Sequence, residues 1–155
     1  MFNHILVPLD GSDNSELALA HAFSLAEAYG GARITLLAVM LRFPESKIHV
    51  PSLDAQSEER GKAYLSSVVA KHGPRSMPLD LSVKLGVPAS EIIAAARGRD
   101  IDIIVMATHG TTGVERDQRS IGSTAWRVLH DAPCPVLLVP APPWTPALHT
   151  APGDR

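Results

Sequence analysis

Several features that would place the chain in a special class are scarce or missing. A single cysteine, Cys134, stands among 155 residues, so no disulfide can form within the chain and nothing indicates an oxidising compartment. Net charge is −2 and 19% of residues are charged, which favours neither nucleic acid nor an anionic membrane as a partner. No apolar run has the length of a membrane span or a secretion signal. We therefore expect a cytoplasmic protein.

What is present suits one ordinary globular domain. Apolar residues make up 45% of the chain, and a domain of about 150 residues buries roughly 70% of its unfolded surface. Regular apolar patterns run through residues 1–140, whereas residues 141–155 are rich in proline and have no period. We predict a folded domain over 1–140 and a flexible tail over 141–155.

The apolar patterns alternate between strands and helices. Apolar, β-branched runs predict strands over 4–10, 32–40, 79–86, 101–107 and 134–140. Helical spacing predicts helices from Asp13 to Gly30, from Asp54 to Gly73, over 88–98, and after Ser123, with a loop over 41–53. This order predicts an α/β fold, a three-layer open parallel five-stranded sheet with helices on both faces. Strand orders 2-1-3-4-5 and 3-2-1-4-5 both satisfy right-handed crossovers.

Three local predictions follow from the same patterns. Asp13 and Glu16 have the spacing of a capping box at the start of the first helix. In the second helix, Ala63, Leu65 and Val68 share one face and are expected to point inward. The run over 79–86 alternates between apolar and polar residues, which is typical of a half-exposed strand at a sheet edge.

A ligand site is expected where the winding of such a sheet reverses. In the order 3-2-1-4-5 this point lies at the ends of the first and fourth strands, which read "VPLDG" and "MATHG". Asp10 there can accept a ribose hydroxyl or hold Mg²⁺, or it can simply form the turn. Gly122, Ser123 and Thr124 open a helix whose free N–H groups attract anions; a plain N-cap by Ser123 or Ser120 is the alternative.

Several segments together resemble the universal stress protein family. They are "ILVPLDGSDNSELAL", "ITLLAV", "LGVPASEII", "DIIVMATHG" and "GSTAWRVLHDAPCPVLLVP", and they cover roughly residues 3–140. The resemblance implies an adenine-nucleotide α-hydrolase-like fold with strand order 3-2-1-4-5. It also implies a homodimer that pairs through the fifth strand, where Val136, Leu138 and Val139 lie.

Members of this family that bind ATP carry a loop of Gly, two residues, Gly, nine residues, then Gly and Ser or Thr. Here Ala107 stands at the first glycine, and residues 111–121, eleven in all, separate Gly110 from Gly122. Starting instead at Gly110 and Gly113 leaves eight residues before Gly122. The family pattern implies the following nucleotide-binding residues: Pro8, Asp10, Val39, Ala107, His109, Gly110, Gly113, Gly122, Ser123 and Thr124.

Three functions compete on these observations. The first is a stress-response module that binds ATP, with Mg²⁺, as a sensor or regulator and acts as a dimer. The second is a family member that binds no nucleotide and works only through protein contacts. The third is a weak ATPase, for which His109 would need Asp10 as its partner. Motifs of dedicated enzymes, including the Gly-x4-Gly-Lys loop, are absent, which argues against the enzyme. The eleven-residue spacing between Gly110 and Gly122 predicts weak or rearranged nucleotide binding.

Overall fold

The fold alternates strands and helices along the whole domain, as the sequence predicts. A computed structural model describes residues 1–41, 51–72, 77–110 and 121–140. Its elements, in chain order, are β1 (His4–Leu9), α1 (Asp13–Ala28), β2 (Arg33–Met40), α2 (Pro51–His72), β3 (Leu79–Leu85), α3 (Pro88–Gly98), β4 (Ile103–Ala107), α4 (Ser123–Asp131) and β5 (Val136–Val139). The predicted tail over 141–155 lies outside the described residues.

The five strands form one parallel sheet in the order β3-β2-β1-β4-β5. This confirms the order 3-2-1-4-5 and excludes the alternative 2-1-3-4-5. Pairing is in register from His4 opposite Arg33 to Leu9 opposite Ala38, and β4 lies on the other side of β1. The winding therefore reverses between β1 and β4, and the carboxyl ends of these strands form the crevice that the sequence predicts.

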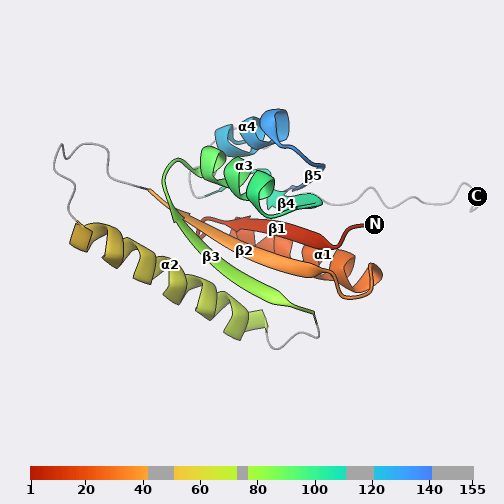
Figure 1. Ribbon diagram of the computed structural model, residues 1–155, viewed down its shortest axis with the longest axis horizontal. Coiled ribbons are helices and arrows are strands. Elements are labelled where there is room, and N and C mark those ends of the chain that lie inside the picture. Colours follow the sequence, from red (N-terminus) through yellow and green to blue (C-terminus); the bar gives the residue numbers. More distant parts are fainter. Residues whose placement is uncertain (42–50, 73–76, 111–120, 141–155) are drawn as a thin grey trace, which may run out of the picture.

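Helices cover both faces of the sheet (Figure 1). On one face, α1 and α2 pack on a cluster centred on β1 and β2, with Ile5, Val7, Leu36 and Leu65 at or near zero exposure. On the other face, α3 and α4 pack on a second cluster that includes Leu6, Leu37 and Ile104. Alternate residues of β1, β2 and β4 thus enter opposite cores, which explains why these strands read as continuous apolar runs.

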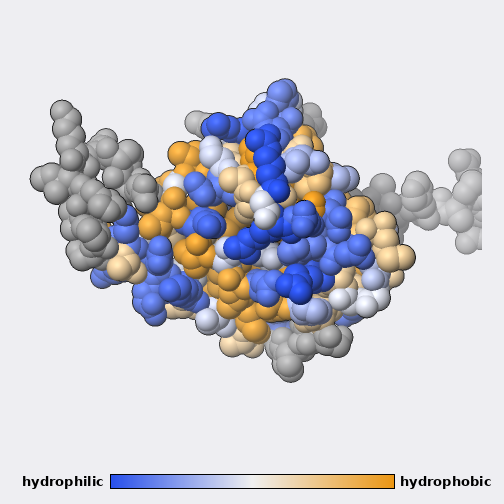
Figure 2. Space-filling model, viewed as in Figure 1, coloured by the Kyte–Doolittle hydropathy of each residue, from blue (hydrophilic) through white to orange (hydrophobic). Residues whose placement is uncertain are grey.

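On the α3 side of the sheet, the part of β2 and β3 that α3 does not cover carries polar side chains. Arg33 Nη1 lies 3.1 Å from Asp80 Oδ2, and Arg99 Nη2 donates to Ser82 Oγ at 3.0 Å. Figure 2 shows hydrophilic residues gathered over the middle of this face. The predicted half-exposed character of the third strand is confirmed, because β3 is an edge strand and most of its residues are only partly buried or exposed.

The start of α1 differs from the predicted capping box. The N-cap is Ser12, whose Oγ accepts from the backbone N–H of Ser15 at 3.1 Å. Asp13 and Glu16 instead lie within the first turn, where negative charge interacts favourably with the helix dipole. The prediction failed because an aspartate and a serine stand side by side, and both are good caps.

The second helix also differs from its prediction. It begins at Pro51 instead of Asp54, since proline is well suited to the first turn of a helix. Ala63 is exposed, and Gly61 occupies the inward position in its place. A Cβ on Gly61 would lie 2.7 Å from Val83 Cγ1, so the glycine allows α2 to approach β3 closely. No helix among the described ranges is long and apolar enough to cross a membrane.

Asp102 joins the N-terminal ends of β1 and β4. Its Oδ2 accepts from the backbone N–H of Asn3 at 2.7 Å and of His4 at 2.9 Å, and its own N–H donates to the carbonyl of His4. The bond from Asn3 is the main cause that lowers the pKa of Asp102 below its usual value. The carboxylate therefore stabilises the central strand pair when it is charged.

We expect Asp102→Ala to lower the free energy of unfolding by about 1 kcal/mol at pH 7, the low end for bonds to a charged group because water reaches this carboxylate. Since the folded pKa is depressed, this stability is present above the unfolded pKa of about 3.9 and is lost as the pH falls. Urea unfolding of both proteins at pH 7 and pH 3 measures the difference. An equal difference at both pH values would contradict the assignment.

Candidate functional site

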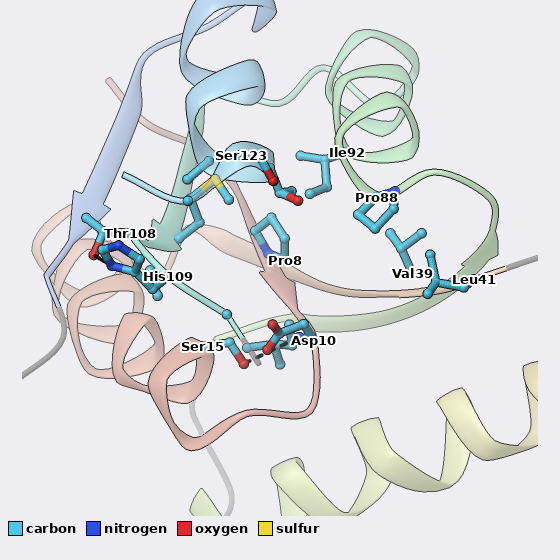
Figure 3. Close-up of a pocket in the computed structure, with 17 residues that line it drawn as sticks. Pro8, Asp10, Ser15, Val39, Leu41, Pro88, Ile92, Thr108, His109 and Ser123 are labelled. Atoms are coloured by element: carbon cyan, nitrogen blue, oxygen red, sulfur yellow. Dashed lines mark hydrogen bonds between the residues drawn. The ribbon is translucent and has the colours of Figure 1, made fainter. Parts of the chain in front are cut away.

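A cavity of about 300 Å³ opens at the carboxyl edge of the sheet, between the ends of β1 and β4 (Figure 3). Its volume is in the range of small-molecule sites. The walls come from β1, β2, β4, the first turns of α1, α3 and α4, and the turn after β4. They comprise Pro8, Leu9, Asp10, Ser15, Val39, Leu41, Pro88, Ile92, Met106, Ala107, Thr108, His109, Gly110, Gly122, Ser123, Thr124 and Ala125.

Every predicted binding residue within the described ranges lines this cavity. Gly113 lies outside the described residues. Sequence reasoning missed eight lining residues: Leu9, Ser15, Leu41, Pro88, Ile92, Met106, Thr108 and Ala125. The start of α3 was available as a signal, because helices that follow parallel strands begin at the same edge of the sheet where the ligand crevice lies.

Asp10 forms the turn after β1 and also faces the cavity. Its Oδ1 accepts from Ser12 N at 3.0 Å and from Ser12 Oγ at 2.6 Å. Gly11 between them has a φ of +86°, a conformation that glycine adopts without strain. The two readings of Asp10 are therefore compatible, because one carboxylate oxygen holds the turn and the residue still lines the cavity.

Gly110 allows the turn after β4 to lie directly against Asp10. A Cβ at this position would overlap Asp10 Oδ2 and lie 3.1 Å from its Cγ. The missing side chain therefore makes room for the carboxylate at the point where the two central strands end. Any residue other than glycine would have to displace it.

Ala107 carries no backbone strain. It is the last residue of β4 and pairs with Val139, and it does not belong to the residues of positive φ. Alanine is thus compatible with the extended backbone at the position where the family pattern has glycine. The difference in loop length, not this substitution, is the principal departure from the family pattern.

The start of α4 supplies the opposite wall of the cavity. Gly122 is its N-cap, with no side-chain cap and no acidic residue in the first turn, so the alternative of a plain N-cap by Ser123 or Ser120 does not hold. Gly122 N donates to Thr108 O at 2.8 Å, so the helix start is tied to the turn after β4. A helix of nine residues that begins at a cavity and has no side-chain cap among the described residues is suited to an anion.

His109 lies beside Thr108 and away from Asp10 in Figure 3. Its Nδ1 lies 3.0 Å from Thr108 Oγ1. Its Nε2 is buried and has no hydrogen-bond partner among the described residues. This placement suits a packing or positioning residue, and it gives no support to a catalytic pair with Asp10.

Charge in the cavity is sparse and negative. Within the described part of the lining, Asp10 is the only acid, and there is no lysine or arginine. The same ranges contain no group of three side chains that could hold a metal ion on their own. Cys134 lies elsewhere, half-buried against the α3 and α4 cluster, and burial raises the pKa of its thiol.

The fold and the cavity together define a doubly wound α/β domain with a small-molecule site at its switch point. The sequence model of the universal stress protein family matches residues 1–140. A universal stress protein of Methanocaldococcus jannaschii, MJ0531, is 33% identical over 145 residues, which cover 92% of this chain and 84% of the relative. The chain belongs to the universal stress protein family.

Solved structures agree with this assignment. UspA from Lactobacillus plantarum has a TM-score of 0.71 at 28% identity, with 89% of this chain and 97% of that chain covered. Two more distant structures share the fold. A universal stress protein in complex with cAMP has a TM-score of 0.63 at 18% identity, with coverage of 89% and 97%. A family protein from Arabidopsis thaliana with AMP bound has a TM-score of 0.63 at 16% identity, with coverage of 88% and 90%.

We expect Gly122→Ala to lower the free energy of unfolding by about 1–3 kcal/mol, as overpacking against rigid neighbours does, because its Cβ would lie 3.0 Å from the backbone oxygen of Thr108. Gly98→Ala is the matched control. Its Cβ meets nothing within 4 Å, and alanine is the better helix former. Thermal unfolding of both variants measures the contrast. Equal stability of the two variants would show that the turn after β4 and the start of α4 are not held closely together.

Proposed function

We propose that this universal stress protein binds an adenine nucleotide as a cytoplasmic sensor or regulatory module. The observation that carries the proposal is the shape of one cavity, with Asp10 at one end and the start of α4 at the other. Apolar side chains lie among its remaining walls. A carboxylate, an apolar wall and a helix N-terminus around one cavity suit, respectively, the ribose, the base and the phosphate of a nucleotide. AMP and cAMP in two proteins of the same fold support it.

Each part of the cavity has a role in this proposal. Val39, Pro88 and Ile92 offer apolar surface to the base. Asp10 accepts from ribose hydroxyls. The N–H groups at the start of α4, together with the hydroxyls of Ser123 and Thr124, receive a phosphate.

Divalent cations should assist the binding of a triphosphate. The described lining carries one carboxylate and no cationic side chain, so ATP would bring several negative charges close to Asp10. Mg²⁺ takes oxygen ligands from carboxylates and substrate phosphates together. As the one carboxylate of the described lining, Asp10 is the residue that would share Mg²⁺ with ATP, and this role is the alternative to its bond with the ribose.

Nucleotide stabilisation tests the proposal and the role of the longer loop. With ATP and Mg²⁺ at a hundredfold excess over Kd, binding raises native stability by about 2.7 kcal/mol. We expect the unaltered protein, called the parent below, to melt at a higher temperature with ATP and Mg²⁺ than without ligand. ATP alone should give a smaller increase. Because Ala107 is unstrained, Ala107→Gly should change this response little. Removal of two residues between Thr112 and Arg119 should increase it.

If the parent shows no shift with ATP, with or without Mg²⁺, and the shortened loop shows none either, the chain works without nucleotide through protein contacts. A strong shift in the parent that the shortened loop does not increase would show that the longer loop is compatible with tight binding.

We also propose that two copies pair through β5. This strand ends the sheet at the edge opposite β3, and an uncovered edge favours pairing with another chain. Val136, Leu138 and Val139 were predicted for this interface; in the single chain Val139 is buried and Leu137 is 37% exposed. On α4, Trp126 is 61% and Leu129 is 42% exposed. These apolar side chains add surface that a second copy would cover.

Leu137→Lys should convert the dimer to a monomer at micromolar concentration, because it puts a charge on the pairing edge. Leu17→Lys on α1 is the matched control, since Leu17 has the same exposed fraction of 37%. Sedimentation equilibrium of the parent and both variants measures the mass. A parent that is monomeric, or a dimer that persists in Leu137→Lys, would contradict pairing through β5.

A further inference from the structure

The hydroxyl of Tyr64 is a buried polar atom that packing does not explain. The ring packs from α2 against the first core cluster, yet its Oη is buried and has no hydrogen-bond partner within the described ranges. A phenylalanine would fill the same space without the cost of removing a hydroxyl from water. A buried polar group of this kind calls for another reason to be present.

The hydroxyl lies behind the turn that presents Asp10. Its neighbours are the side chain of Ser15 and the backbone of Gly11, and the charges of Glu16 and Asp10 act on it. Although both groups are close enough to influence the hydroxyl, it makes no hydrogen bond of acceptable geometry to either of them. A small movement of the turn toward α2, or of α2 toward the turn, would complete a bond.

Ser15 connects this hydroxyl to the cavity. Its Oγ donates to Ser12 O at 2.8 Å and accepts from Asp10 N at 3.3 Å. Ser12 in turn donates twice to Asp10 Oδ1, and Asp10 Oδ2 lies against Gly110. The position of Ser15 therefore determines the position of the carboxylate, and Ser15 itself is buried and lines the cavity.

We propose that Tyr64 is a positioning residue for Asp10. Its hydroxyl supports Ser15 and Gly11 from behind, and it completes a hydrogen bond when a ligand engages the carboxylate. The occupied cavity then holds α2 against the Asp10 turn, so α2 responds to the ligand. The ligand part of this inference rests on the proposed function, whereas the support of Asp10 does not.

The first experiment uses the protein without nucleotide. Amide NMR spectra of Tyr64→Phe and of Tyr29→Phe are compared with the parent; these are the two tyrosines of the chain. In Tyr64→Phe we expect shifts at Gly11, Ser12 and Ser15 and also at Gly110, which reports the place of the Asp10 carboxylate. Tyr29→Phe should shift none of them. Shifts confined to α2 would overturn the positioning role.

The second experiment measures the affinity for AMP, and for ATP with Mg²⁺, by calorimetry. Tyr64→Phe should bind either nucleotide about fivefold more weakly than the parent, the value of one ordinary hydrogen bond, with a melting temperature equal to or above that of the parent. Tyr29→Phe should bind as the parent does. A variant that loses stability but keeps its affinity would show that Tyr64 is structural only.

The two experiments separate the failure of the inference from the failure of the proposed function. If neither nucleotide binds the parent, the proposed function is wrong, and the response of Gly110 to Tyr64→Phe still decides whether the hydroxyl positions Asp10. If nucleotide binds the parent and Tyr64→Phe changes neither the affinity nor the resonance of Gly110, the inference alone is wrong.

Discussion

The close approach of two turns at the carboxyl edge of the sheet is the constraint on which the site depends. Gly110 leaves room for the Asp10 carboxylate. Gly122 donates its N–H to Thr108 O, and a side chain at Gly122 would crowd the same oxygen. These two contacts bring the end of β1, the end of β4 and the start of α4 together. The glycines at both positions allow this close approach, so part of the cavity wall is backbone.

The sequence predicts the frame of the molecule well because strand and helix periods are strong and regular. Right-handed crossovers reduce the strand orders to two, and the family resemblance selects the one observed. The switch-point rule then predicts the crevice between β1 and β4, where Asp10, Val39 and Gly122 line one cavity. Apolar β-branched runs and glycine turns were sufficient signals, because the carboxyl ends of parallel strands necessarily meet at one edge.

The details that failed depend on tertiary contacts. Two adjacent cap residues, Ser12 and Asp13, cannot be ranked without knowing which oxygen reaches the Ser15 N–H. The inward side of α2 was misassigned because Gly61, not Ala63, meets β3. Nothing in the sequence brings Tyr64 near the Asp10 turn, since a contact between α2 and the start of α1 has no local pattern.

The most direct test of the account is an amide NMR map of the parent with AMP, and then with ATP and Mg²⁺. The account predicts that both ends of the cavity respond together, with shifts at Asp10 and Gly110 and at Ser123 and Thr124, and that ATP without Mg²⁺ has a smaller effect. Shifts at one end alone, or only at residues remote from the cavity, would contradict the claim that this crevice holds a whole adenine nucleotide.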